Sequence, residues 1–219
     1  MIKLHGFSLS GNTYKVALML QALDVAWEPV FVDYLGGQTR DPNWRAQANE
    51  MGEVPVLEDG ARRLTQSGAI LTQLAREHGA FGGRNEGEQQ DVLRWLLFDN
   101  HKFTSYLASY RFMRSFGPAA PDPAVMAWLK GRMDAAFGVV EKHLSAQPFV
   151  VGDALTIADF SMCGYLFYPS EETGLDLPAQ YPHIAAWLDR IQAMPRWAGP
   201  YDLLPGERMA PKWTGGSGW

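Results

Sequence analysis

The chain has 219 residues and a formal net charge of −5, from 19 Lys and Arg residues against 24 Asp and Glu residues. At about 100–200 residues per domain, this length accommodates one large domain or two small ones. The acidic balance, without any block of Lys and Arg, argues against nucleic acid as the main partner. A single cysteine, Cys163, excludes an internal disulfide and a cysteine-based metal cluster.

The sequence contains no apolar run near the roughly 20 residues that cross a bilayer. Residues 1–5 also lack the long apolar stretch of a signal peptide. The histidines fit no metal-ligand spacing. We therefore expect a cytoplasmic protein without a membrane segment or a metal site.

Residues 1–80 alternate strand and helix signals. Residues 2–5 alternate in polarity, which predicts a short strand, and residues 16–24 carry apolar side chains at helical spacing. Val30 and Val32 predict a second strand. Such a β-α-β unit normally contains a parallel strand pair with a right-handed crossover.

Two more strands are predicted at residues 54–57 and 63–65, separated by an Asp-Gly turn typical of an antiparallel hairpin. Ser67 is expected to cap the helix that follows, and Gly79 to end it. The order over the first eighty residues is therefore β-α-β, a loop, then β-β-α.

Residues 81–90 are rich in glycine and polar side chains and are predicted to form a linker. Residues 91–219 carry helical patterns almost exclusively, including one continuous run from residue 93 to residue 116. Thr156 is expected to cap a later helix, with Asp159 reaching back as a variant capping box. The tail beyond residue 200 is expected to wrap or fray.

The turn after the first strand places Ser8, Ser10 and Asn12 at the start of a helix. A helix N-terminus favours an anion, and a hydroxyl donor aimed at a thiolate lowers the pKa of the thiol. Ser10 or Asn12 is equally able to act only as a helix cap. The residues alone leave both interpretations open.

Two later features add a peptide-binding edge. Val54-Pro55 directly precedes a predicted strand, where a cis proline would leave the Val54 backbone free to pair with an extended peptide. A trans proline on an edge strand is the alternative. Gln66 and Ser67 stand at the head of the next helix, where they would either cap it or hold a carboxylate.

The order and spacing of these features resemble the cytosolic glutathione transferases over about residues 1–200. The resemblance rests on Ser10-Gly11-Asn12, Gly52-Glu53-Val54-Pro55, Gln66-Ser67 and Thr156-Ile157-Ala158-Asp159. It implies an α+β, thioredoxin-like N-terminal domain, an all-α helical-bundle domain and a homodimer. The serine turn is similar to that of bacterial classes such as Nu, theta and zeta, although the Ser-Ser-Cys turn of zeta is absent.

The resemblance implies that glutathione is the co-substrate and that Ser10 lies beside its sulfur, with Asn12 nearby. Tyr14 is a weaker alternative, because it falls inside the predicted helix. The cysteine-using classes do not match, since Cys163 lies far along the chain. Cys163 is expected to be a small core residue.

The resemblance also implies that Val54, after the cis bond to Pro55, pairs with the cysteinyl backbone of glutathione. Gln66 and Ser67 would hold its γ-glutamyl end. Glu53 departs from the family pattern, because a carboxylate there would repel the glycine carboxylate of glutathione.

The remaining assignments concern the two ends of the ligand. Gln38 and Arg40 are candidates for the glycine carboxylate. Phe103, Tyr106 and Tyr110 either pack in the core or line a pocket for a small hydrophobic electrophile. Two alternative functions remain open at this stage, a glutathione-dependent reductase of disulfides or peroxides and a non-catalytic binding module.

Overall fold

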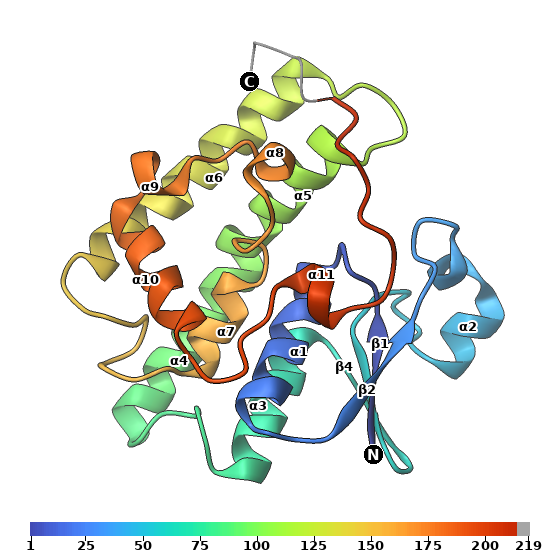
Figure 1. The fold of residues 1–219 in the computed structure, drawn as a ribbon, viewed down its shortest axis with the longest axis horizontal. Coiled ribbons are helices and arrows are strands. Elements are labelled where there is room, and N and C mark those ends of the chain that lie inside the picture. The colour runs from blue at the N-terminus through green and yellow to red at the C-terminus, as the bar shows by residue number, and fades with distance from the viewer. Residues whose placement is uncertain (214–219) are drawn as a thin grey trace.

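The computed structural model describes residues 1–213. Its N-terminal half is built on a four-stranded sheet with the strand order β2-β1-β3-β4 (Figure 1). The strands are β1 (Ile2–Gly6), β2 (Trp27–Phe31), β3 (Val56–Asp59) and β4 (Arg62–Thr65). Strand β1 is parallel to β2 and antiparallel to β3, and β3 is antiparallel to β4. The predicted parallel β-α-β unit and the hairpin are both confirmed.

Three helices belong to this half: α1 (Gly11–Ala22), α2 (Pro42–Gln47) and α3 (Ser67–His78). Figure 1 shows α1 and α3 on the side of the sheet that faces the helical half, and α2 beyond the other side. A turn of 3₁₀-helix, Gln38–Arg40, precedes α2. The arrangement confirms the predicted α+β, thioredoxin-like fold.

Three local expectations differ from the structure by one or two residues. Strand β3 begins at Val56 instead of residue 54, because Pro55 has no N–H for the ladder. The Val54–Pro55 bond is cis. Ser67 is the first residue of α3, so the cap position belongs to Gln66, at φ 66°. Val32 lies just beyond β2. Gly79 ends α3 in the left-handed conformation, as expected.

The second half is helical, as predicted. Its helices are α4 (Glu86–Phe98), α5 (Thr104–Ser115), α6 (Pro123–Leu144), α7 (Ile157–Cys163), α8 (Ser170–Thr173), α9 (Leu177–Gln180), α10 (Pro182–Gln192) and α11 (Pro200–Leu203). Helix α4 begins inside the stretch expected to be a linker, where the Asn85 side chain accepts a hydrogen bond from the Glu88 amide. The short helices α8, α9 and α11 had no separate signal in the sequence.

A turn of π-helix, Asp99–Phe103, divides the expected helical run from residue 93 to residue 116 into α4 and α5. A π-turn accommodates one extra residue, so it rotates the faces of the helix that follows. The side chains of α5 that point toward the N-terminal half are therefore not the ones that a continuous α-helix would present.

Helix α7 lies at the centre of the molecule, and all seven of its residues are buried. Thr156 caps it, and Asp159 accepts a hydrogen bond from the Thr156 amide at 2.8 Å, which confirms the capping box. Asp159 also accepts from the Trp187 indole and the Val150 amide, each at 2.8 Å. Helices α1 and α3 pack on α7, so one continuous core joins the two halves.

The C-terminal segment wraps back across the molecule, which was one of the two outcomes expected for the tail. Figure 1 shows the chain beyond α11 passing near the start of α1 and continuing to the far end of α5. The Ser8 amide donates to the Pro205 carbonyl at 2.8 Å, and the Lys212 amide donates to the Ser115 carbonyl at 3.0 Å. The part of the tail prediction that concerns residues 214–219 lies outside the described residues. Among residues 1–213, every helix is too short or too polar to traverse a bilayer.

Candidate active site

A cavity of about 610 Å³ opens between the two halves of the chain. Its size lies within the range of ordinary small-molecule sites, about 300–1,000 Å³. The N-terminal half contributes a polar end, and its side of the cavity is lined by Ser10, Asn12, Glu53, Val54, Pro55, Gln66 and Ser67. Six of these seven are residues that the sequence assigned to the site, and Glu53 is the residue that it marked as a departure from the family pattern.

Ser10 holds the N-cap position of α1 and is one of the residues that line the cavity. Its oxygen accepts hydrogen bonds from the Thr13 amide at 3.1 Å and from the Thr13 hydroxyl at 3.0 Å. The side chain is buried apart from this opening. Because both contacts use the oxygen as an acceptor, the proton of the Ser10 hydroxyl is available to a ligand. Ser10 therefore caps the helix and still has a donor to offer.

The α1 N-terminus lies close to the helical half. A Cβ atom on Gly11 would lie 2.4 Å from the ring of Tyr165, so only glycine fits at this position. Tyr165 lines the cavity beside Ser10. Burial raises the pKa of its hydroxyl, which therefore stays protonated at neutral pH.

Tyr14 was the alternative candidate, and the structure places it elsewhere. Its side chain is fully buried, and its hydroxyl donates to the Ala198 carbonyl at 2.9 Å. Burial raises the pKa of Tyr14 far above its usual value. Tyr14 is not among the described residues that line the cavity.

The second polar group of the cavity combines Glu53, Gln66 and Ser67. The Gln66 amide donates to the Glu53 carboxylate at 2.8 Å. The Ser67 hydroxyl lies 3.5 Å from the Asn12 side-chain oxygen. The Asn49 side chain holds the Glu53 carbonyl at 2.9 Å and so fixes the backbone next to Val54. An acidic side chain and neutral donors therefore share one end of the cavity.

Gln38 and Arg40, the candidates for the glycine carboxylate, lie on the 3₁₀-turn. The Gln38 side chain accepts from the Asp33 amide at 2.7 Å, and Arg40 is exposed next to Gly37. Neither residue is among the described residues that line the cavity.

The aromatic residues proposed as pocket walls also lie off the cavity. Phe103 and Tyr110 are buried, with Phe103 stacked on Phe137. Tyr106 packs edge-on against Trp128. The face of α5 toward the cavity instead carries Ser105, Ala108, Ser109, Arg111 and Phe112. Phe103 and Tyr106 instead pack against Phe137 and Trp128 of α6, so this side of the helical run is buried between helices.

The apolar side of the cavity comes from both halves. Phe7 and Tyr34 stack with ring centroids 5.1 Å apart, and Phe112 and Phe116 face them from the helical half. Sequence analysis did not single out these residues. Arg111 was missed as well, although it stands on the stripe Thr104, Leu107, Arg111 and Ser115, whose members are buried at helical spacing. A charged residue on a buried stripe was the available signal.

Two family profiles match the chain. The N-terminal domain of glutathione S-transferases matches residues 4–85, and the C-terminal domain of glutathione S-transferases matches residues 104–195. A crystal structure of glutathione S-transferase from Pseudomonas fluorescens is 35% identical, with a TM-score of 0.81 over 91% of this chain and 98% of that chain. The chain belongs to the glutathione S-transferase family. It is a glutathione transferase, of a family whose co-substrate is glutathione.

Other relatives agree with this assignment. Glutathione S-transferase 3 from Zea mays is 28% identical over 216 residues, which cover 93% of this chain and 95% of the relative. A structure of Ure2p in complex with glutathione has a TM-score of 0.81 over 93% of this chain and 97% of that chain, at 22% identity. At that identity the likeness concerns the fold. Among residues 1–213, no group of three or more metal-binding side chains gathers at one place.

Proposed function

We propose that this glutathione transferase activates glutathione with the Ser10 hydroxyl and transfers the thiolate to a small hydrophobic electrophile. The observation that supports this most directly is the hydroxyl itself. It lines the cavity at the N-terminus of α1, and its oxygen accepts two bonds from Thr13 while its proton remains free to donate. A sulfur placed there receives one hydrogen bond and the field of the helix N-terminus.

The energy of these two effects is sufficient for the chemistry. A free thiol has a pKa of about 8.5, and lowering it by two units requires about 2.7 kcal/mol. One hydrogen bond to a charged group contributes about 1.5–3 kcal/mol, and a helix N-terminus adds about 0.3–1 kcal/mol. The thiol proton passes to solvent, and the thiolate then forms a C–S bond to the electrophile without a metal or a general base. In substitution a leaving group such as a halide departs with its bonding pair, and in conjugate addition the electrons of the C=C bond move toward the activating group and the product takes a proton from water.

The polar end of the cavity would bind the rest of glutathione. The Val54 backbone would pair with the cysteinyl unit, and Ser67 would donate to the γ-glutamyl carboxylate at the start of α3. The γ-glutamyl end also carries an ammonium group. Because Gln66 holds the Glu53 carboxylate at this end, Glu53 would accept that ammonium and would not meet the glycine carboxylate. In this arrangement the negative charge of Glu53, which departs from the family pattern, favours the binding of glutathione.

The apolar side of the cavity would hold the electrophile. Phe7 and Tyr34 present stacked rings, and Phe112 lies opposite them, half-exposed. Flat apolar walls beside a thiolate favour aromatic or unsaturated compounds, which lose water on binding and stack on the rings. The walls would bring the electrophilic carbon close to the sulfur.

Replacement of Ser10 tests this proposal. We expect Ser10→Ala to lower the turnover of a halonitrobenzene substrate at neutral pH at least tenfold and to leave retention on immobilised glutathione intact. Ser109→Ala is the matched control, because it removes a hydroxyl from the opposite wall of the same cavity. Unchanged turnover in Ser10→Ala would refute the role of Ser10. Absent retention and absent thiol-dependent activity in the unaltered protein would favour a binding module.

A reductase is the second candidate function. Asn12 adds an amide to the sulfur end of the cavity, next to Ser67, so two polar side chains flank the place of the sulfur. At such a site the thiolate of the first glutathione would attack a disulfide, releasing one thiol and forming a mixed disulfide. A second glutathione would then release the other thiol and form oxidised glutathione. With a peroxide, the first step would release an alcohol and leave a glutathione sulfenic acid, which the second glutathione would convert to oxidised glutathione and water. Comparing disulfide and peroxide substrates with halonitrobenzenes at equal glutathione concentration separates the two reactions.

We also propose that the protein is a cytoplasmic homodimer. Leu93 and Leu97 lie one turn apart on α4, and 48% and 63% of their surfaces are exposed. Apolar side chains in such an arrangement favour burial against a second copy. Sedimentation or size-exclusion measurements on the protein and on Leu97→Glu test the dimer, which the added charge should weaken.

A further inference from the structure

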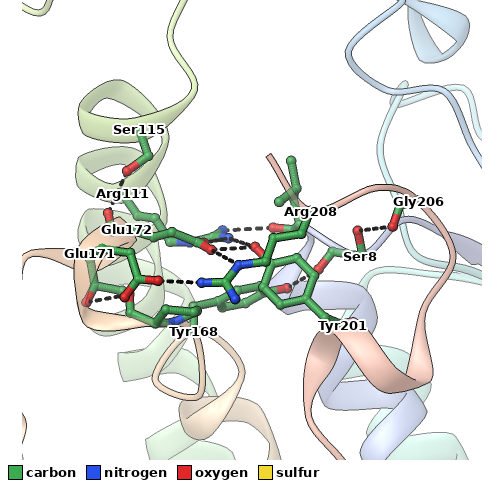
Figure 2. A network of polar contacts seen from close by, with 12 residues as sticks. Ser8, Arg111, Ser115, Tyr168, Glu171, Glu172, Tyr201, Gly206 and Arg208 are labelled. Atoms are coloured by element: carbon green, nitrogen blue, oxygen red, sulfur yellow. Dashed lines mark hydrogen bonds and ion pairs between the residues drawn. The ribbon is translucent and has the colours of Figure 1, made fainter. Parts of the chain in front are cut away.

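The loop between β1 and α1, residues Phe7–Ser10, is held by groups from the second half of the chain. The Ser8 hydroxyl donates to the Gly206 carbonyl at 3.1 Å, and the Ser8 carbonyl accepts from the Tyr168 hydroxyl at 2.6 Å (Figure 2). The Ser8 amide donates to Pro205. Three polar groups of one buried loop residue are therefore bound to partners that lie between 160 and 198 positions away in the sequence.

The next residue of the loop is bound by Arg111. The Nη1 of Arg111 donates to the carbonyl of this residue, Leu9, at 2.9 Å. Its Nε and Nη2 donate to Glu172 Oε2 at 3.1 Å and 2.5 Å. The guanidinium carbon Cζ also lies over the Tyr168 ring, 3.6 Å from the ring centroid. Arg111 is thus fixed on three sides, and its contact with the loop is one residue away from Ser10.

Glu172 is held in turn by the C-terminal segment. The Tyr201 hydroxyl donates to Glu172 Oε1 at 2.7 Å, and the Arg208 side chain lies 3.6 Å from the same oxygen. Arg208 also pairs with Glu171 at 2.5 Å, and Figure 2 shows it between Glu171 and Tyr201. Burial and the bond to Glu172 raise the pKa of Tyr201, so its hydroxyl remains a donor.

We propose that Arg111 is a positioning residue for Ser10, acting through the Leu9 carbonyl, and that Glu172 and Tyr201 hold Arg111 in place. This inference rests on the proposed role of Ser10. A bond to the Leu9 carbonyl fixes the peptide that leads into Ser10. The direction in which the hydroxyl meets the sulfur is then set by the C-terminal half and by α1 together.

The geometry distinguishes this role from two others. An arginine that bound an anionic electrophile would need a free pair of donors facing the cavity, whereas the Nε and Nη2 of Arg111 are directed at Glu172. An arginine that served only to neutralise Glu172 would not need the bond to Leu9. The ion pair is almost completely buried, with 3% and 0% of the two side chains exposed. This burial holds the guanidinium in one orientation.

Two changes loosen the contact in different ways. Tyr201→Phe removes one donor to Glu172 and keeps the ring that packs edge-on against Tyr168. Its control is Tyr181→Phe, which removes a comparable bond of 2.8 Å to Asp134, remote from the loop. The double variant Arg111→Met with Glu172→Leu removes the anchor of Leu9 without leaving a buried unpaired charge, so the fold is retained.

The first readout is the pH dependence of kcat/KM for the electrophile at saturating glutathione, which reports the pKa of the bound thiol. We expect the double variant to move the profile to higher pH by about one unit, equivalent to about a tenfold loss at neutral pH, with the glutathione KM nearly unchanged. Tyr201→Phe should move it in the same direction by less. Tyr181→Phe should reproduce the profile of the unaltered protein, because a general loss of stability does not alter the pKa of a bound thiol.

The second readout is hydrogen exchange of the Ser8 and Thr13 amides, which needs no glutathione chemistry. Both amides should exchange faster in the double variant and remain protected in Tyr181→Phe. Normal protection together with an unshifted pH profile in the double variant would overturn the proposal. If Ser10→Ala has the same turnover as the unaltered protein, the proposed function fails. The hydrogen-exchange data alone then decide whether Arg111 positions the loop.

Discussion

The Lys15 ammonium group lies 3.1 Å from the Asp99 carboxylate, and neither side chain is exposed to solvent. Lys15 belongs to α1, whose N-cap is Ser10, and Asp99 begins the π-turn before α5. The Ser161 hydroxyl on α7 donates to the same Asp99 oxygen at 2.6 Å. This buried pair therefore joins the elements that form the two walls of the cavity.

Breaking the pair should destabilise the protein. We expect Lys15→Met to lower the free energy of unfolding by about 3–5 kcal/mol, because it leaves an uncompensated carboxylate in the core. The double variant Lys15→Met with Asp99→Leu should recover most of that loss. Urea denaturation followed by tryptophan fluorescence measures both. Equal stability of Lys15→Met and the unaltered protein would show that the pair contributes nothing.

Glu53 should favour glutathione binding. We expect Glu53→Gln to raise the glutathione KM about tenfold or more, because a charge-assisted bond to the γ-glutamyl ammonium contributes about 1.5–3 kcal/mol. Glu50→Gln is the control, since it removes a carboxylate from the same loop at an exposed position. A glutathione analogue without the α-amino group should bind Glu53→Gln and the Glu50→Gln control with equal affinity. A lower KM in Glu53→Gln would indicate repulsion of the glycine carboxylate instead.

The capping box at α7 should be a main determinant of stability. Asp159 is completely buried and accepts from two amides and the Trp187 indole. Asp159→Asn replaces an acceptor oxygen with a donor and would leave at least one of these groups unsatisfied, at a cost of about 1–3 kcal/mol. We expect a lower Tm in a calorimetric scan. A Tm within experimental error of the unaltered protein would contradict this.

Cys163 should be unreactive in the folded protein. Its thiol is buried, and this burial is the main cause that raises its pKa well above the usual value. The nearby charge of Asp159 raises the pKa further. Because only the thiolate reacts, an aromatic disulfide reagent should label Cys163 on unfolding and not before. Titration with and without denaturant measures this. Rapid labelling of the native protein would show that the surroundings of α7 open readily.

Much of the fold followed from local patterns. The β-α-β order, the hairpin and the Thr156–Asp159 box each have a signal within a few residues, and all three are present. The π-turn at Asp99–Phe103 had no such signal. It joins two stretches whose sequence patterns both predict an ordinary α-helix. The first residue of the turn, Asp99, pairs with Lys15, and this pair forms only when the two halves of the chain come together.

The site divides in the same way. Ser10, Val54 and Ser67 stand at turns and helix starts, where residue type indicates position, and the structure brings them to one cavity. The residues of the opposite wall, such as Phe112, depend on which side of α5 packs against α6, a contact across the fold. A wrapping C-terminal segment was one of the two expectations for the tail, but its attachment to Ser8 had no sequence signal, because Ser8 and Gly206 are separated by almost the whole chain.

The pKa of the glutathione thiol in the bound state tests the central claim most directly. It is measured by titrating the ultraviolet absorbance of the thiolate in complexes with the unaltered protein and with Ser10→Ala. The account predicts a pKa about two units below the free value of about 8.5 in the unaltered protein, and a return of at least one unit toward that value in Ser10→Ala. An equally low pKa in both proteins would contradict it.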